Sequence, residues 1–401
     1  MKCLHQVGAA NWTAAILMSI ICVRFSSAYF TYAAVIFCLF LIYDLYQTRR
    51  GNWKLWPEWT VNCRRVLLYT VGFYGVLLLE SIALQDAASI SKTLDLAALS
   101  LPLFMFAYLS GKYPINKGIM WGLFAGIGIV LIYGLLREYW LFPGERFKSF
   151  FAHGPHFGTA VCMWLPLCAY YWKKTENRCM RVAWGLIMAG QAYCVYLTIS
   201  RGAIAAFVGA CLITCGVMVW MRRKQWSWRI MKAAVIGGIV ILAVGGAATW
   251  HLQSERSDRA KIGGDRIQMI EASYHMWEDH KLLGVGLARW QETYYSPQYF
   301  PPDALEYGLD MPHNMPVHFF STAGTIGGAA YLLLCAGTFL GLYRTAKQSN
   351  DDLLSAAIMI GFISFFLQGL VDTTIINKIP ARIYFALMGW YLASGKRLSR
   401  G

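Results

Sequence analysis

The chain has 401 residues, of which 57% are hydrophobic and only 14% are charged, whereas soluble chains are nearer half apolar and a quarter charged. This composition excludes an ordinary soluble protein and indicates an integral membrane protein, because the apolar residues come in runs long enough to span a bilayer. The formal net charge of +15 does not indicate nucleic acid as a partner. The basic residues are divided among short connections, and lysine and arginine ordinarily mark the cytoplasmic ends of spanning helices.

The first apolar run resembles a secretory signal peptide. Lys2 precedes the run 12–23, and the small residues 26–28 follow it, an order of charge, apolar segment and small residues that is typical of cleaved leaders. A second apolar run, 28–46, follows with hardly a gap, and this favours an uncleaved first helix. We therefore expect the first run to remain as a membrane span.

The apolar runs along the rest of the chain predict an all-α fold, a polytopic membrane bundle of about twelve transmembrane helices. The expected spans are residues 9–26, 28–46, 66–84, 94–109, 119–136, 157–172, 182–199, 203–221, 233–250, 317–342, 353–370 and 383–394. The first nine spans thus occupy residues 1–250, a long external loop occupies 251–316, and the last three spans occupy 317–401.

The charged residues between the spans predict the orientation. Most of the 36 basic residues fall in connections that face the cytoplasm if the N-terminus is inside, so we expect both termini to be cytoplasmic. All 11 cysteines then lie in spans or cytoplasmic segments, and we expect no disulfides. Every histidine except His5 lies on the external side, which is therefore the side on which to look for function.

The long external loop has a helical pattern at its start. Apolar residues recur at helical spacing from a beginning near Asp265, at Ile267, Ile270, Tyr274 and Trp277. Such an amphipathic helix can lie on the membrane surface or cap the bundle. The aromatic and proline-rich stretch 294–307 that follows is either loop packing or a surface on which sugars stack.

Two arginines are candidates for binding an anion. Arg201 stands between two apolar runs, where a cation costs about 2.5–3.5 kcal/mol at a helix centre and less near an interface; the plain alternative is an arginine that snorkels or orders the turn. Arg266 opens the amphipathic helix, where free N–H groups favour anions, although it could simply pair with Asp265 or Glu271. Together the two guanidinium groups could clamp a diphosphate.

His313 is the candidate general base. It stands where the long loop returns to the membrane, and a histidine side chain ordinarily titrates near pH 6.5, which suits proton transfer at neutral pH. The alternative is a histidine that faces solvent or caps a helix. Asn314 beside it could orient the ring or bind a sugar hydroxyl.

The remaining external residues admit simpler interpretations. Asp372 and Lys378 face outward in the turn 371–382 and could form an ion pair. The glycines at 324, 327 and 328 indicate close helix packing. Histidines occur as pairs, but no carboxylate stands at a suitable spacing, so we expect neither a metal nor a cofactor; the pairs are His153 and His156, His275 and His280, and His313 and His318.

These features, in this order and on one side of the membrane, resemble the O-antigen ligase family, within the broader group of O-antigen ligases, polymerases and bacterial oligosaccharyltransferases. The resemblance covers essentially the whole chain and lies in the joint order of its motifs. An arginine is common in the family where Lys378 stands. The motifs are Thr198 to Ala203, Gly264-Asp265-Arg266, Pro312-His313-Asn314 with Gly324 and Gly327, Gly369 to Asp372 with Lys378, and Glu145-Arg146.

The resemblance implies a GT-C-like glycosyltransferase in the bacterial inner membrane with its active site in the periplasm. Its donor is a glycan on undecaprenyl diphosphate, which a ligase transfers en bloc to lipid A-core with inversion and without a metal. His313 would deprotonate the acceptor hydroxyl, and Arg201 and Arg266 would bind the diphosphate. Arg146 and Lys378 are further candidates for the same anionic pocket.

Two alternatives remain beside the ligase. A polymerase uses the same donor and differs only in its acceptor, whereas chain length favours the ligase over the protein-targeting oligosaccharyltransferases, which usually carry a larger additional domain. A flippase or transporter would place charges along the interiors of its spans, whereas the charges of this chain cluster at one face.

Overall fold

The expected spans coincide with helices wherever the structure describes them. The computed structural model describes residues 2–23, 28–50, 56–141, 147–198, 200–223, 237, 262–302 and 309–398, so the expected span 233–250 lies outside the described residues. Regular structure in these ranges is helical, in agreement with the all-α expectation. The elements are α1 (Lys2–Cys22), α2 (Tyr29–Arg49), α3 (Val61–Ala83), α4 (Ala87–Leu99), α5 (Leu101–Lys112), α6 (Asn116–Leu136), the π-helix η1 (Arg137–Leu141), α7 (Gly154–Lys174), α8 (Arg178–Thr198), α9 (Arg201–Arg222), α11 (Ile262–Asp279), α12 (Trp290–Tyr294), α13 (Met315–Gln348), α14 (Asp352–Gln368) and α15 (Lys378–Leu398).

Several of these helices are long and apolar enough to cross a membrane. By length and composition there are 6 of them among the described residues, if α4 and α5 are counted together as one: α2, α3, α4 with α5, α6, α9 and α13. The helix α14 is apolar but shorter. The chain is therefore a multi-pass membrane helix bundle. The helices α1, α7, α8 and α15 have similar lengths but fall short of that apolarity, so the count of about twelve spans stays a prediction.

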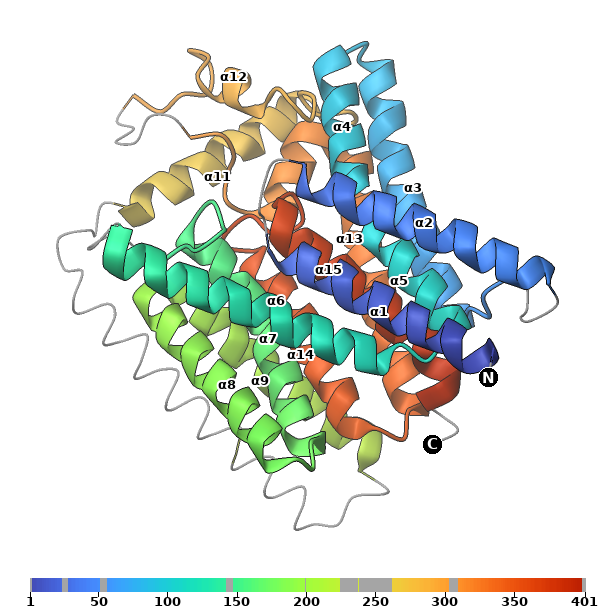
Figure 1. Cartoon of the computed structure of the whole chain (residues 1–401). Helices are drawn as coiled ribbons and strands as arrows, with labels where there is room; N and C mark the ends of the chain where they lie inside the picture. The colour runs from blue at the N-terminus through green and yellow to red at the C-terminus, as the bar shows by residue number, and fades with distance from the viewer. Residues whose placement is uncertain are drawn as a thin grey trace.

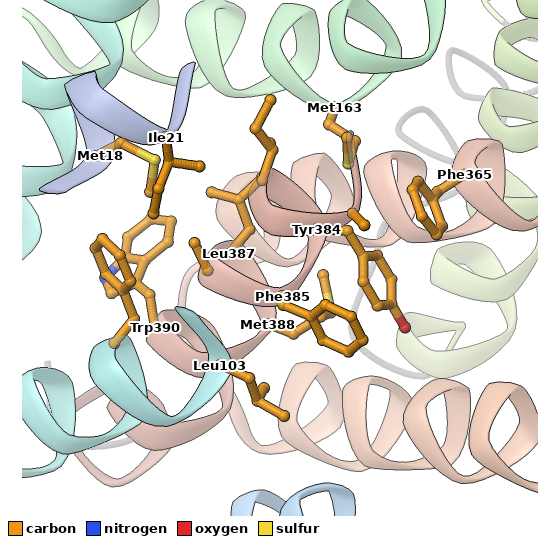
Figure 2. Packing of buried hydrophobic residues seen from close by; sticks show 14 of the residues in the cluster. Met18, Ile21, Leu103, Met163, Phe365, Tyr384, Phe385, Leu387, Met388 and Trp390 are labelled. Atoms are coloured by element: carbon orange, nitrogen blue, oxygen red, sulfur yellow. The ribbon is translucent and has the colours of Figure 1, made fainter. Parts of the chain in front are cut away.

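The last helix, α15, lies at the centre of the bundle. It packs against α1, α5, α7, α13 and α14, and Figure 2 shows side chains from α1, α5, α7 and α14 gathered around its Tyr384, Leu387 and Trp390. A Cβ added to Gly389 would lie 2.2 Å from the Leu103 carbonyl oxygen. The backbones of α15 and α5 therefore touch, and a central helix in such contact needs few residues that favour lipid.

A stripe of glycines brings α1 and α6 together. A Cβ added to Gly118 would lie 2.3 Å from the Asn11 carbonyl oxygen, and one added to Gly122 would lie 2.7 Å from the Ala15 carbonyl oxygen. Small residues four apart allow two membrane helices to approach this closely. The first predicted span is thus packed into the core of the bundle.

Both termini lie at one end of the bundle, which we call the terminus end (Figure 1). Two buried cations hold helices together there. Lys112 donates to Asp44 at 2.6 Å, and the hydroxyls of Tyr108 and Tyr113 donate to the same carboxylate. Arg222 donates to the carbonyl oxygens of Ala346 and Ser349 and to Asp352, satisfying the last carbonyls of α13. 

At the opposite end, which we call the loop end, α11 and α12 form a small unit with its own core (Figure 1). Trp290 and Tyr294 are each 1% exposed, and their rings stack with centroids 4.8 Å apart. Tyr299 is also buried, and its hydroxyl donates to Asp279 at 2.7 Å. Tyr294 and Tyr299, at least, therefore belong to the packing of the loop unit. Tyr307 lies outside the described residues.

An ion pair fastens this unit to the connection between α3 and α4. Arg289 donates to Asp86 through Nη2 to Oδ1 at 2.8 Å and through Nε to Oδ2 at 3.1 Å. The hydroxyl of Ser89 donates to the same carboxylate at 2.5 Å and accepts from the Ala288 amide at 3.0 Å. The donors from Arg289 and Ser89 hold the pKa of Asp86 well below its usual range.

The long helix α13 is broken near its start, where the loop unit touches it. Gly324 has φ +60, and a Cβ there would lie 2.1 Å from the Leu282 carbonyl oxygen. The carbonyl oxygens of Ser321 and Thr322, which the break frees, accept from the amides of Val285 at 3.0 Å and Gly286 at 2.9 Å. The interpretation of this glycine as helix packing is wrong, because it permits the break and the loop contact.

Candidate functional site

The turn between α14 and α15 is joined to the start of α13 by three consecutive residues. The Met315 amide donates to the Gly369 carbonyl oxygen at 2.7 Å, and the Asn314 side chain donates to the Leu370 carbonyl oxygen at 2.8 Å. The third bond joins the Nδ1 atom of His313 to the Oδ1 atom of Asp372 at 3.1 Å. We call residues 368–372 the site turn, because the other candidate residues gather on it.

The hydrogen bond to Asp372 determines which ring nitrogen of His313 carries the hydrogen. A carboxylate only accepts hydrogen bonds, so Nδ1 of the neutral ring carries the hydrogen and Nε2 carries the lone pair. Asp372 is 6% exposed, whereas the His313 side chain is 30% exposed. A partly accessible imidazole backed by a buried carboxylate has the arrangement of a general base and the group that orients it.

The backbone of His313 is strained. Its φ is +49, a conformation that usually costs a residue other than glycine about 1–3 kcal/mol. The three bonds to the site turn hold the backbone in this conformation and offset that cost. Strain of this kind is concentrated at functional positions, where a side chain must be aimed.

The charge on Asp372 is stabilised in place. Burial raises the pKa of this carboxyl, but the hydrogen bonds from His313 and from the Thr373 amide at 2.7 Å outweigh it, so its pKa lies below the usual value. Asp372 therefore stays ionised at neutral pH. The expectation that it pairs with Lys378 is wrong, because its partners are His313 and Thr373.

Arg266 reaches the site turn from the loop unit. Its Nη1 atom donates to the Val371 carbonyl oxygen at 3.0 Å, and the residue is exposed. Among the described residues, Arg266 does not form the alternative ion pair with Glu271. The remaining N–H groups of the guanidinium lie at the surface beside the turn, where a ligand can reach them.

Arg201 begins α9 beside a glycine that packs against the site turn. It is the first residue of α9 and is half-buried. A Cβ added to its neighbour Gly202 would lie 3.3 Å from the Gln368 side-chain oxygen and 3.3 Å from Val371 Cγ2. Among the described residues none forms an ion pair with Arg201. The starts of α9 and α11 thus both reach the site turn, α9 through Gly202 and α11 through Arg266.

The other predicted residues have different placements. Asn314 caps α13, because its Oδ1 atom accepts from the Val317 amide at 3.0 Å while its amide nitrogen donates to the Leu370 carbonyl oxygen. Both ends of its side chain are thus bonded within the protein. Lys378 is exposed at the first residue of α15. Arg146 lies outside the described residues.

A second histidine, His156, supports the site, although the sequence indicates it only as half of a histidine pair. His156 is buried at the start of α7, where its Nε2 atom accepts from the Asn377 side chain at 2.8 Å and lies 3.3 Å from the Thr373 hydroxyl. It therefore supports the far side of the segment that carries Asp372. Within the described ranges, no group of three histidine, cysteine or carboxylate side chains is arranged to hold a metal ion.

Fold and site together define a multi-pass α-helical membrane protein with an oriented histidine and two arginines at one end of the bundle. Residues 185–332, from within α8 to within α13, match the family model described as O-antigen ligase. This match supports the resemblance of the chain to the O-antigen ligase family. The matched segment includes Arg201, Arg266, His313 and Asn314, whereas Arg146, Asp372 and Lys378 lie outside it. No curated protein matches the chain.

Proposed function

We propose that the chain is an O-antigen ligase that transfers a glycan from undecaprenyl diphosphate to lipid A-core. The observation that supports this most is that His313 and Arg266 both bond to the site turn, while Arg201 begins α9 beside Gly202, which packs against the same turn. Glycosyl transfer from a lipid diphosphate needs a base for the acceptor and positive charge for the leaving group, and the site offers both.

In the proposed reaction the Nε2 atom of His313 takes the proton of an acceptor hydroxyl. The acceptor oxygen forms the new bond to the anomeric carbon as the bond from that carbon to the diphosphate breaks, and the diphosphate leaves with the electron pair. Arg201 and Arg266 stabilise the charge that develops on it. A single displacement inverts the anomeric configuration. Arg146 and Lys378 are proposed to add charge to the same pocket, and arginines take the place of a metal.

The proposal includes a location. We place the loop end in the periplasm and both termini in the cytoplasm of a bacterium, with about twelve helices across the inner membrane in a GT-C-like arrangement. In support, the N-terminus of α1 and the C-terminus of α15 lie at the end of the bundle away from α11 and α12 (Figure 1). The basic residues between the spans favour the same orientation.

The experiment that tests this function varies the acceptor. Purified protein in liposomes is given lipid-linked glycan, with and without lipid A-core, and the products are separated by size. A ligase forms glycan-bearing lipid A-core only in the first mixture, and because no metal takes part, EDTA leaves the rate unchanged. Growth of the glycan on its carrier in the second mixture identifies a polymerase and contradicts the proposal.

A further inference from the structure

The helix α11 carries an apolar stripe that the protein leaves uncovered. Its buried side, which includes Met269 and Met276 at 1% and 0% exposure, faces the small core of the loop unit. On a different side Ile267 is 66% exposed, Ile270 is 36% exposed and Tyr274 is 50% exposed. The spacing of three and four residues aligns these side chains along the helix, and we call them the α11 stripe.

This stripe is continuous with an apolar flank of a membrane-spanning helix. The ring of Trp277, one turn beyond Tyr274, contacts Phe320 with centroids 6.3 Å apart, and its Nε1 atom donates to the Thr325 hydroxyl at 3.0 Å. From there α13 exposes large apolar side chains seven residues apart. They are Ile326, Leu333 and Leu340, exposed by 47%, 58% and 46%, and α13 is long and apolar enough to span the membrane.

We propose that α11 is an interfacial helix whose stripe is buried in the leaflet on the loop side of the membrane. The α13 flank has lipid as its natural neighbour, and Trp277 at the end of the stripe contacts α13 at Phe320 and Thr325, directly before that flank. Tyrosine and tryptophan also favour the boundary between acyl chains and headgroups. Figure 1 shows α11 crossing the end of the bundle instead of running alongside the long helices, as an interfacial helix does.

The charge on α11 defines the kind of lipid contact. Glu271 and Glu278, both exposed, lie beside the stripe. Acidic side chains do not attract anionic headgroups, so the stripe is held by burial of apolar surface and its position does not depend on anionic lipid. This arrangement also fixes the depth of Arg266, which precedes the stripe directly. The diphosphate of a lipid-linked glycan lies at headgroup depth, so Arg266 would be held at the level of the donor's diphosphate. This consequence rests on the proposed function.

The test measures the surroundings of α11 with a fluorescent probe. Ile270→Cys on the stripe and His275→Cys on the charged side are each labelled with an environment-sensitive maleimide, in a chain whose exposed Cys38 and Cys179 are changed to alanine. The labelled proteins are placed in phosphatidylcholine liposomes that contain spin-labelled lipid. We expect shallow spin labels to quench the probe at 270 several-fold more than the probe at 275, with or without anionic lipid.

Two outcomes overturn the proposal. Quenching of the probe at 270 by aqueous iodide, to the same extent as at 275, means that the stripe faces water. Shielding from both iodide and spin-labelled lipid means that protein covers it, for example a second copy of the chain. The experiment measures the position of α11 and not a reaction, so the two proposals can fail independently. A ligase whose stripe faces water contradicts only the lipid contact. A chain whose stripe lies in lipid but that transfers no glycan contradicts only the proposed function.

Discussion

At the scale of single residues, the pairing of His313 with Asp372 determines the chemistry of the site. A neutral imidazole has two tautomers, and only the one with its hydrogen on Nδ1 leaves Nε2 as the base. The buried carboxylate selects that tautomer, and in the proposed reaction it would stabilise the imidazolium formed when the acceptor gives up its proton. The same carboxylate accepts from the Thr373 amide, so it also holds the turn.

Replacing Asp372 with asparagine removes the charge and keeps the shape. We expect Asp372→Asn to lower the rate of transfer by about 10²–10⁴-fold, the range that a positioned general base contributes. The folded pKa of Asp372 is lowered, so its contribution to stability is present above the unfolded value of about 3.9 and is lost as the pH falls through the folded value. Thermal unfolding of both proteins should therefore show a difference that is constant near neutral pH and shrinks in strong acid.

His275→Ala serves as the control for this substitution, because His275 pairs with Glu278 on the surface of α11. A difference in melting temperature that grows toward low pH would contradict the assigned sign. An unchanged rate of transfer would mean that Asp372 does not act through His313.

The arginines at the site can bind phosphate in a way that a lysine of the same charge cannot. A guanidinium presents a planar fork to phosphate oxygens, and a lysine presents a single point of charge. We expect Arg266→Ala to lower transfer by about 10²–10³-fold, as the loss of one preorganised donor does elsewhere, and Arg266→Lys to recover only part of it. Initial rates with lipid-linked glycan measure both.

The exposed Arg65 at the terminus end of α3 provides the matched substitution, and Arg65→Lys should transfer at the wild-type rate. Full activity of Arg266→Lys would exclude fork-like recognition, and full activity of Arg266→Ala would remove this residue from the clamp.

The site residues could be predicted from the sequence individually but not as pairs. A histidine and two arginines on the external side of a membrane chain are unusual enough to indicate function, and Arg266 and His313 do meet at the site turn. The bond between His313 and Asp372 joins residues 59 positions apart, and nothing in the sequence favours it over a pair with the nearer Lys378. The sequence indicates His156 only as half of a histidine pair, because a buried polar side chain at a helix end resembles any other.

At the scale of elements, apolar length predicts helices and misses the points at which they break. The span expected at 94–109 belongs to two helices, α4 and α5, which are separated at Ser100. Pro102 stands near the start of α5. The break in α13 depends on the loop 281–286, whose amides and carbonyls replace the lost helical bonds. That contact is tertiary, so the local pattern of α13 could not reveal it.

Gly324→Ala tests the break. The new side chain would meet the Leu282 carbonyl oxygen at 2.1 Å and require φ +60, so we expect a loss of at least about 1–3 kcal/mol in the free energy of unfolding, measured by thermal denaturation in detergent. Gly75→Ala is the control, because a Cβ there meets nothing within 4 Å and alanine favours the helix. Equal melting temperatures for the two variants would mean that the loop does not impose the break.

At the scale of the whole molecule, the two ends of the bundle use charge differently. At the terminus end Lys112 and Arg222 are buried and their partners satisfy them, so part of the positive charge expected at a cytoplasmic face stabilises the packing. At the loop end Arg201 and Arg266 lie half-buried and exposed, beside a histidine that is held in strain. The bundle thus provides a rigid support for charged groups that are open to a ligand.

We propose that His313 is the base of a glycosyl transfer to lipid A-core, and this role can be measured directly. The most direct measurement is the initial rate of that transfer by purified His313→Ala, beside the wild-type chain and His275→Ala, in liposomes that contain lipid-linked glycan and lipid A-core. We expect His313→Ala to lose about 10²–10⁴-fold in rate while it inserts and melts like a folded protein, and His275→Ala to keep the wild-type rate. Transfer by His313→Ala at the wild-type rate would contradict this role.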